Sequence, residues 1–459
     1  MNKQKIGYLP DEKPPIGKLL LYALQQMIVM FPATITVALI TGFQVSTTIF
    51  ASGLATICFS LITKRKLPLY YGSSFAYLSA ISGLVAAQGF ATTNGILPTE
   101  AIRIAQFGII MSGLVSIAAG LLVRWAGREM VEKILPPSVT GPVAMIIGLT
   151  LAGNALSDAA PAADQTQLVW IVSLATFLST VLFSKYLKGF LGQLPLLLGA
   201  AVGCLTALLI YLIGGDQYNL FRSLPPEVLA ASSWKLGSGS IFALPAFSLP
   251  KASLAAVAAI MPIAIATIPE STAHVYQLDI YVNDIAREKG SKKKYDMVSL
   301  LDKNLIGDGL CDMVTGLIGG PAGTNYGENI STMAITRVFS VPVLMAAAVM
   351  AMVMSCFTPL ISAIYGIPLA VIGGLEVYLF GAIAAQGIAI LIDKKCDMFS
   401  SKNIAVIASV MVLGLGINYT FGGTLNFFGI GIPAVAGAAI FGIILNLLLS
   451  IGEKKSEKE

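Results

Sequence analysis

The chain has 459 residues, of which 56% are hydrophobic and 12% are charged. Soluble globular domains carry about 25% charged residues, so this composition excludes an ordinary soluble enzyme and indicates a protein that lies mostly in lipid. The net charge of +5 does not indicate a nucleic-acid partner, because the basic residues lie in short loops between apolar runs.

Apolar runs of about 20 residues, enough to cross the hydrocarbon core of a bilayer, recur along the whole chain. They predict an all-α, multi-pass membrane protein, because helices satisfy their own backbone polar groups in lipid. Fourteen segments, some of them short, are predicted at residues 17–41, 45–62, 72–88, 104–123, 139–156, 166–184, 195–214, 252–273, 304–319, 326–338, 341–364, 367–392, 403–418 and 429–451.

The basic residues test this segment count independently, because cytoplasmic loops of membrane proteins are enriched in lysine and arginine. If the N-terminus lies inside, 25 of the 29 lysines and arginines fall in inner loops or in the tails. The four in outer loops are Arg103, Arg222, Lys235 and Lys251. We therefore predict that both termini are cytoplasmic.

The predicted segments divide into two halves of seven. Residues 1–214 form the first half and residues 252–451 the second, with an outer loop at 215–251 and a polar cytoplasmic tail at 452–459. An odd number per half forces the second half to enter the membrane upside down, which is the inverted-repeat plan of many secondary transporters. The basic inner loop at 285–303 is expected to anchor at the membrane surface, since lysines attract anionic headgroups.

The third segment of each half begins with a polar interruption that contains glycine. Segment 3 opens with LPLYYGSSFAYLSA, and segment 10 opens with GGPAGTNYGENISTMA. Interruptions at matching positions are the best sequence indication of a binding site near the middle of the bilayer. In segment 3, Ser73, Ser74 and Phe75 supply hydroxyls, a backbone N–H and an aromatic ring.

Two glutamates at membrane depth are the strongest functional candidates. Glu270 follows Pro269 in segment 8, and Glu328 follows the interruption of segment 10. A carboxylate at this depth costs about 2.5 kcal/mol or more, so it requires a partner or a function. The single histidine, His274, lies four residues after Glu270 on the same helical face, where it could relay a proton. The alternative for Glu270 is a structural carboxylate that a polar neighbour satisfies.

Tyr326 and Gly327, which precede Glu328, add other recognition chemistry. Gly327 lets the main chain approach a ligand closely, and an N–H group at the start of a half-helix can bind a carbonyl oxygen. Tyr326 offers a flat apolar face beside a polar tip. Tyr326 and Phe75 could equally be packing residues, and Glu328 could be a cap of its half-helix.

Three other acids at membrane depth have no single interpretation. Asp308 and Asp312 lie four residues apart in segment 9 and would face either one cavity or the polar groups of neighbouring helices. Glu376 in segment 12 has no evident partner in the sequence, and a contact with another helix or subunit explains it as well as transport does.

The motifs exclude the enzyme classes that we considered. Glu270 and His274 form ExxxH rather than the HExxH of zinc peptidases, and one histidine excludes a multi-histidine metal centre. The five scattered cysteines form no CxxC pair and predict neither zinc nor disulfides. No P-loop sequence occurs. We predict a transporter without a cofactor; a membrane sensor or an intramembrane protease is the alternative from another class.

Several of these segments resemble motifs of the nucleobase–ascorbate transporter family, also called the nucleobase:cation symporters. They are GPAGTNYGENISTMAITRV in segment 10, ATIPESTAH in segment 8, YYGSSFAY in segment 3, LLDKNLIGDG before segment 9 and LPPSVTGPVAMIIGL at segment 5. The Tyr-Gly-Glu-Asn form in segment 10 is similar to that of the bacterial uracil permease branch, whereas purine-selective members usually carry Gln-Asn there. The chain departs from the family at Gln26, where a histidine is common, and at Glu376.

The resemblance implies two inverted seven-segment repeats, arranged as a core domain that holds the site and a gate domain that moves against it. Short extended stretches of segments 3 and 10 would meet at the centre. The resemblance also implies a homodimer in the plasma (inner) membrane that imports uracil together with protons. By the same resemblance, the substrate-binding residues are Phe75, Glu270, Tyr326, Gly327 and Glu328.

In that family-based assignment, the glutamates accept hydrogen bonds from the ring N–H groups of uracil, and backbone N–H groups near Phe75 and Gly327 bind its carbonyls. Proton coupling is assigned to Glu270, His274 and Glu328. The chemistry agrees, because a ring with N–H donors and C=O acceptors complements carboxylates and main-chain amides. Protonation would also offset the cost of a buried carboxylate. Xanthine or another purine is the alternative substrate, and an anion transporter of the same inverted-repeat plan is a further alternative.

Overall fold

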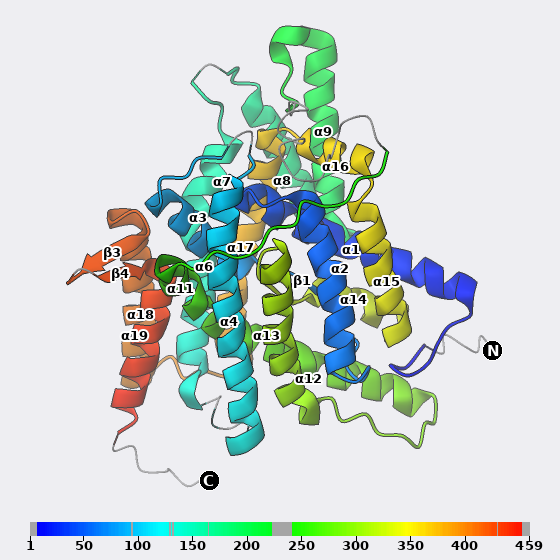
Figure 1. Cartoon of the computed structure of the whole chain (residues 1–459), viewed down its shortest axis with the longest axis vertical. Coiled ribbons are helices and arrows are strands. Elements are labelled where there is room, and N and C mark those ends of the chain that lie inside the picture. The colour runs from blue at the N-terminus through cyan, green and yellow to red at the C-terminus, as the bar shows by residue number, and fades with distance from the viewer. Residues whose placement is uncertain are drawn as a thin grey trace.

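The structure is a computed structural model that describes residues 7–92, 95–127, 130, 133–163, 165–222, 241–428 and 430–451. Most of these residues lie in helices (Figure 1). The predicted tail at 452–459 lies outside the described residues, as do residues 223–240 of the predicted outer loop.

Helices dominate both halves of the chain, and two pairs of short strands complete the fold. The first half contains α1 (Ile16–Thr41), α2 (Val45–Ile62), β1 (Tyr71–Ser73), η1 (Phe75–Tyr77), α3 (Leu78–Ala87), α4 (Thr99–Ala126), α6 (Pro137–Thr150), α7 (Ala152–Ala159), α8 (Val169–Tyr186) and α9 (Pro195–Gly214). The second half contains α11 (Leu254–Ile260), η4 (Met261–Ile263), α12 (Ala264–Glu288), α13 (Leu301–Ile318), β2 (Gly323–Asn325), α14 (Gly327–Thr336), α15 (Val341–Ser355), α16 (Thr358–Tyr365), α17 (Leu369–Asp393), α18 (Ser401–Thr420), β3 (Thr424–Phe427), β4 (Ile430–Pro433) and α19 (Ala434–Leu449).

Nine helices of the described residues are long and apolar enough to cross a membrane, with α6–α7 and α11–α12 each counted as one. Three shorter apolar helices are η1–α3, α15 and α19. The predicted segments 9 and 10 correspond to α13 and to the short helix α14. The chain is therefore a helical, multi-pass membrane protein as predicted, and the count of fourteen segments stays a prediction.

Three elements differ from the predicted segments. Segment 8 is longer than predicted and is interrupted at η4, because Pro262 has no N–H group to continue the helical hydrogen bonding. Segment 11, predicted at 341–364, ends at Ser355 and is followed by the separate helix α16. Between α18 and α19 the chain forms the antiparallel hairpin β3–β4, which the sequence analysis did not predict.

The helices pack as two groups. In the first helix group, which comprises α1–α4 and α11–α15, α4 packs on α13, while α2 packs on both α15 and α13. In the second helix group, which comprises α6–α9 and α17–α19, α17 packs on α6, α7 and α8, and α18 packs on α6 and α19. The second helix group occupies the left and upper parts of Figure 1.

Glycines bring the helices of each group into close contact. A Cβ atom added at Gly309 of α13 would overlap the carbonyl oxygen of Gly113 in α4. In the second helix group, a Cβ atom at Gly387 of α17 would overlap the carbonyl oxygen of Gly141 in α6. Small residues allow such close backbone approach, which is how helices associate where the surrounding lipid is as apolar as the side chains.

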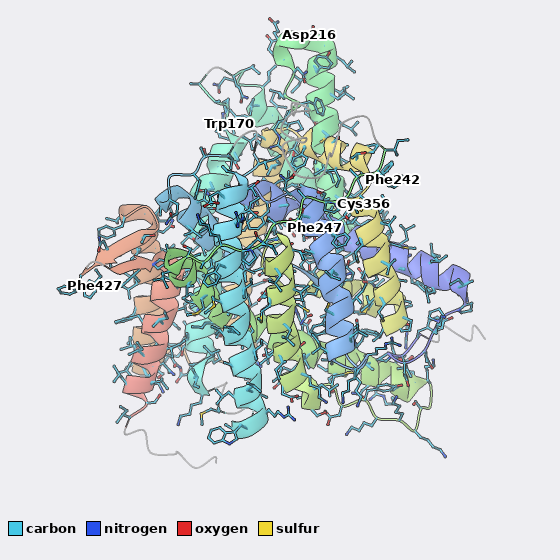
Figure 2. All side chains as sticks on the ribbon, viewed as in Figure 1. Trp170, Asp216, Phe242, Phe247, Cys356 and Phe427 are labelled. Atoms are coloured by element: carbon cyan, nitrogen blue, oxygen red, sulfur yellow. The ribbon has the colours of Figure 1, made fainter. Side chains whose placement is uncertain are left out.

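The segment at 241–251 crosses the ends of α2, α4 and α13. The Thr47 hydroxyl donates to the carbonyl oxygen of Ala246 at 2.8 Å, and the Gln106 side chain donates to the carbonyl oxygen of Ser248 at 2.7 Å. The ring of Phe247 (labelled in Figure 2) packs edge-on against Phe50 at 5.1 Å between centroids. These contacts fix the chain that connects the two halves.

The N-terminal segment at residues 7–13 joins the ends of α12 and α14. The Tyr8 amide donates to the carbonyl oxygen of Arg337 at 2.9 Å, and the Phe339 amide donates to the carbonyl oxygen of Tyr8 at 2.8 Å. Lys289, directly after α12, donates to the Glu12 carboxylate at 2.6 Å. The N-terminal segment therefore holds together the ends of α12 and α14, the two helices that carry Glu270 and Glu328.

The loop that follows α12 binds acids of the N-terminal segment, and its anchoring at a membrane surface stays a prediction. Lys293 donates to the Asp11 carboxylate at 2.6 Å, and the Tyr295 hydroxyl donates to its other oxygen at 2.6 Å. Burial raises the pKa of the Asp11 carboxyl, but the hydrogen bonds from Lys293 and Tyr295 lower the pKa by more, so the net pKa lies below its ordinary value. Lys289 and Lys293 bind protein carboxylates because fixed acids lie within reach of both side chains.

We expect Asp11→Asn to lower the thermal stability of the detergent-purified protein at neutral pH by about 0.2–1 kcal/mol, the range for half-exposed ion pairs. Because the folded pKa of Asp11 is lowered, its contribution is present above the ordinary pKa of about 3.9 and is lost as the pH falls through the lowered value. Melting curves recorded from pH 7 down to about 3 should show wild type and variant converging in acid. Asp284→Asn, which breaks an exposed pair with Arg287 in α12, is the control. A difference between Asp11→Asn and wild type that stays constant with pH would contradict this assignment.

Candidate functional site

The candidate site is built around a short antiparallel ladder inside the first helix group. Three residues of β1 pair with three residues of β2. The Ser74 amide donates to the carbonyl oxygen of Ala322 at 3.0 Å, and the Tyr326 amide donates to the carbonyl oxygen of Tyr70 at 2.9 Å, so the pairing continues beyond both strands. The prediction that extended stretches of segments 3 and 10 meet is confirmed.

Each strand of the ladder leads directly into a half-helix. β1 is followed by η1 and α3, and β2 is followed by α14. The first N–H groups of a helix have no partner within it, and the helix dipole gives them partial positive charge. The Ser74 hydroxyl caps the first half-helix by accepting the Ala76 amide at 3.3 Å, whereas Tyr326 supplies no side-chain cap to α14. The start of α14 is thus suited to bind a carbonyl oxygen.

Two neighbouring helices hold the ladder. From α2, the Ser52 hydroxyl donates to the carbonyl oxygen of Tyr71 at 2.7 Å, and the Thr56 hydroxyl accepts the Tyr71 amide at 3.0 Å. From α13, the Asp312 carboxylate accepts the Gly323 amide at 2.8 Å and the Tyr71 hydroxyl at 2.5 Å. Of the two alternatives for Asp312, the structure shows the one in which it binds polar groups of neighbouring elements.

A buried polar network fixes α12 beside the ladder. The Asn304 side chain donates to the Ser271 hydroxyl at 2.6 Å, and the Ser271 hydroxyl donates to the Asp308 carboxylate. The Asn325 side chain donates to the same carboxylate at 2.9 Å. The network joins α12, α13 and β2 through Ser271, the residue after Glu270, so it fixes the backbone position of Glu270.

A second contact fixes the start of α14. The Asn329 side chain donates to the side-chain oxygen of Gln26 at 2.7 Å and to the Gln26 carbonyl oxygen at 3.0 Å. Both residues are buried, and Asn329 directly follows Glu328. Gln26, which departs from the resembled family, therefore links α1 to the half-helix that carries Glu328.

The two predicted glutamates come together from α12 and α14. The negative charge of Glu328 acts directly on Glu270, so the carboxylates lie within electrostatic range of each other. Glu270 is half-buried, and Glu328 in the first turn of α14 is exposed. Like charges within electrostatic range repel each other, and one bound proton removes that repulsion.

His274 lies against the start of α14. A Cβ atom at Gly327 would be 3.0 Å from its Nε2 atom, and its ring faces the main chain of Asn325. The space that Gly327 leaves open is therefore filled by the imidazole. Among the described residues, Nδ1 of His274 has no hydrogen-bond partner, and no hydrogen bond joins His274 to Glu270. The proton relay between the two stays a prediction.

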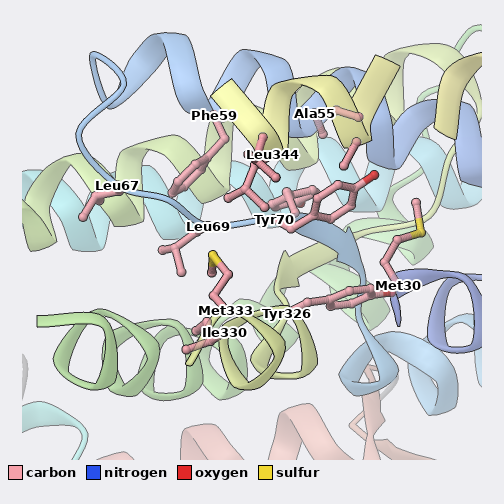
Figure 3. Packing of buried hydrophobic residues seen from close by; sticks show 14 of the residues in the cluster. Met30, Ala55, Phe59, Leu67, Leu69, Tyr70, Tyr326, Ile330, Met333 and Leu344 are labelled. Atoms are coloured by element: carbon pink, nitrogen blue, oxygen red, sulfur yellow. The ribbon is translucent and has the colours of Figure 1, made fainter. Parts of the chain in front are cut away.

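The two predicted aromatic residues occupy different surroundings. Tyr326 is buried in the apolar cluster of Figure 3, where its hydroxyl donates to the carbonyl oxygen of Ser73 at 2.9 Å and lies 3.0 Å from the Thr34 hydroxyl. Its ring covers Gly72 so closely that a Cβ atom there would overlap it. Phe75 is half-buried and retains an accessible face.

The sequence analysis missed three members of the polar network, namely Ser271, Asn304 and Asn325. One signal was present, because Asn304, Asp308 and Asp312 recur every four residues and so share one face of α13. Ser271 and Asn325 carried no such signal. Within the described residues, no group of three histidine, cysteine, aspartate or glutamate side chains is placed to hold a metal ion.

Known proteins with similar sequences are membrane permeases. The model of the Permease family matches residues 17–423. The uracil permease of Bacillus caldolyticus is 34% identical, over 98% of this chain and 95% of its own length. The putative pyrimidine permease RutG of Escherichia coli is 34% identical over 96% and 91%, and the uracil permease of that species is 31% identical over 98% and 95%.

Two solved structures share the fold at low sequence identity. SLC26A9 has a TM-score of 0.61 and 11% identity, covering 96% of this chain and 66% of its own. The transmembrane domain of the cyanobacterial bicarbonate transporter BicA has a TM-score of 0.51 and 17% identity, covering 95% and 97%. The matched family, the motifs and the ladder between two half-helices agree: the chain belongs to the Permease family and is a membrane transporter rather than an enzyme.

Proposed function

We propose that the protein imports uracil together with protons across the plasma membrane. The observation that carries this proposal is the packing of α12 on α14, which puts Glu270 and Glu328 within electrostatic range of each other near the start of α14. The similarity to proteins named uracil permease over nearly the whole chain supports uracil as the substrate.

The chemistry of the site fits a pyrimidine ring. Uracil presents two N–H donors and two carbonyl acceptors in one plane, and its complement is a set of carboxylate acceptors and main-chain donors. Glu270 and Glu328 would accept from the ring N–H groups, and the N–H groups near Gly327 and Phe75 would donate to its carbonyls. The accessible face of Phe75 would cover the ring, while Tyr326 would contact it from the packed cluster beneath.

Proton coupling follows from the repulsion between the two glutamates. Binding of one proton removes a negative charge from the pair and makes the site less costly to enclose. His274, beside Gly327, is placed to influence the proton at either acid. A carrier that reorients only when its charge is reduced in this way moves the proton and the substrate in the same direction.

The packing of the helices supports two inverted repeats, at 1–214 and 252–451. By predicted segment number, the packing of α2 on α15 pairs segment 2 with segment 11, and the packing of α13 on α4 pairs segment 9 with segment 4. Moving each segment number by seven converts the first pair into the second, as two repeats of seven segments require. The pairs α8–α9 and α18–α19 are related in the same way, as are α8–α17 and α18–α6. In this proposal the first helix group is the core domain and the second the gate domain of a homodimer with cytoplasmic termini.

The two alternative substrates, an anion and a purine, predict a different site chemistry or a different order of competing bases. One solved structure with this fold is described as an anion transporter, but two carboxylates at the centre would repel an anionic substrate. Xanthine or another purine would use the same donors and acceptors in a larger ring. Competition of unlabelled bases with labelled uracil therefore distinguishes uracil from a purine as the substrate.

The test is flux in proteoliposomes that contain only this protein. A pH gradient, acidic outside, should drive labelled uracil to a concentration inside above that outside, and a protonophore should abolish the accumulation. Unlabelled uracil, thymine, cytosine, xanthine and adenine would be added as competitors. Stronger competition by xanthine than by uracil would change the substrate to a purine. Uptake that never exceeds the outside concentration would contradict proton coupling, and no flux of any base would contradict the proposal as a whole.

A further inference from the structure

A second acidic site lies in the other helix group. Glu376 of α17 is fully buried, with 0% of its surface exposed, and among the described residues no N–H or O–H donor reaches either carboxylate oxygen. An ionised carboxylate without donors is very costly in such a place. The proposed transport mechanism makes no use of this residue.

The neighbour of Glu376 is the carboxyl group of Asp158 at the end of α7, and the two side chains lie close enough to act on each other. The backbones bring them together, because a Cβ atom at Gly373 would overlap the main chain of Asp158. Gly373 lies one turn before Glu376 on α17. Ionised carboxylates only accept hydrogen bonds, so two carboxyl groups can bond to each other only through a proton.

The cationic group beside this acid pair is Arg222. Its charge acts on Asp158, its Nε atom donates to the carbonyl oxygen of Ile367 at 2.6 Å, and its amide donates to the carbonyl oxygen of Gly366 at 3.1 Å. Its buried Nη2 group has no partner among the described residues. Burial lowers the pKa of Arg222, and the charge of Asp158 opposes that change.

The other elements around the pair contribute little charge. Tyr365 of α16 acts on Arg222, and its hydroxyl accepts the amide of Val45 at 2.9 Å. The described residues of α6 and α9 carry no charged side chain, and the one cation of α8 is Lys185, in its last turn. Among the described residues around the pair, Glu376, Asp158 and Arg222 therefore form a set of two acids and one cation.

We propose that Glu376 and Asp158 bind one proton between them, as a proton site separate from the two glutamates of the substrate site, and that Arg222 pairs with Asp158 when this proton leaves. Asp158 is half-buried, whereas Glu376 is fully enclosed, so the proton exchanges with water through Asp158. No bond other than the O–H bond is broken, and the proton passes to water. The site lies on α7 and α17 of the second helix group, so its protonation makes the charge of the proposed gate domain depend on pH.

The experiment measures melting temperature against pH for the detergent-purified full chain, without substrate. An acid that keeps its proton on folding stabilises the protein at low pH, and this stability is lost as the pH rises above about 4.3. Glu376→Gln donates an N–H group to Asp158 at every pH, so its curve should fall less steeply than that of wild type. Asp158→Asn should flatten the curve in the same way, and the double variant should add no further flattening. Asp216→Asn, which removes an exposed acid (labelled in Figure 2), should run parallel to wild type.

Infrared spectra of the same samples provide the second measurement. The carbonyl stretch of a protonated carboxyl group should lose one component in Glu376→Gln and in Asp158→Asn alike. Loss in only one of the variants would assign the proton to one residue and overturn the shared site. Melting curves of both variants that run parallel to wild type, with an unchanged carboxyl band, would overturn the proposal altogether. Because no substrate is used, this result does not depend on whether the protein transports uracil.

Discussion

Glu270→Gln and Glu328→Gln are each expected to abolish uracil uptake while the protein still reaches the membrane in normal amounts. Glutamine keeps the size of the side chain but removes the charge that accepts strongly from a ring N–H group. A hydrogen bond to a charged group is worth about 1.5–3 kcal/mol, which corresponds to about 10–100-fold weaker binding for each lost bond. Loss of a titrating acid also removes the step that couples uptake to the proton gradient. The measurement is initial uptake of labelled uracil in cells and in proteoliposomes, normalised to the amount of transporter.

The matched control is Glu100→Gln. Glu100 is an exposed acid at the start of α4 whose partner is Lys251, and the variant should retain wild-type uptake. Near-normal uptake in both Glu270→Gln and Glu328→Gln would refute the assignment of the site. A loss of uptake caused by misfolding would appear as a broadened peak in size-exclusion chromatography, so both variants would be checked in that way first.

Gly72→Ala is expected to disturb the structure of the site strongly, although it adds a single methyl group. The Cβ atom of alanine would overlap the ring of Tyr326, which is enclosed between β1 and the apolar cluster. Overpacking of a filled interior costs about 1–3 kcal/mol, and here the ring cannot move without breaking its bonds to Ser73 and Thr34. Uptake should be lost, and the melting temperature should fall by several degrees.

Gly83→Ala, in α3 of the same segment, separates this effect from a general intolerance of substitution. A Cβ atom at Gly83 has no atom within 4 Å, so the variant should keep its uptake and gain up to about 1 kcal/mol from helix propensity. The double variant Gly72→Ala with Tyr326→Leu should recover part of the melting temperature, because the smaller side chain makes room. Wild-type stability and uptake in Gly72→Ala would show that the ladder tolerates a wider spacing.

The parts of the site that could be predicted are those in which local chemistry departs from the membrane background. Glycine and polar residues before α3 and α14 indicated the ladder, because such residues interrupt a helix only where the backbone finds other partners. Glu270 and Glu328 stood out because a carboxylate at membrane depth is expensive. Gly72, by contrast, gave no indication that an aromatic ring from residue 326 would cover it.

The parts that could not be predicted depend on partners far apart in the chain. Asn325 and Ser271 are ordinary small polar residues, and only the fold places them around Asp308. The last apolar segment was predicted to begin at residue 429, so it took in β4, whereas β3 lay between two predicted segments. Nothing in TLNFFGIGIP indicated that the two stretches pair. Pro262 indicated a loosened point in segment 8, but hydropathy did not show that the separate short helix η4 forms there.

The ladder between β1 and β2 has a mechanical consequence. It links backbone from the two halves of the sequence, and α2 and α13 clamp it from both sides. The half-helices that begin at its ends cannot drift apart without rupturing several interior bonds at once. In the proposed transporter, the binding residues that they supply would therefore travel as one rigid body, so that a cargo would meet the same arrangement of atoms whichever compartment it came from.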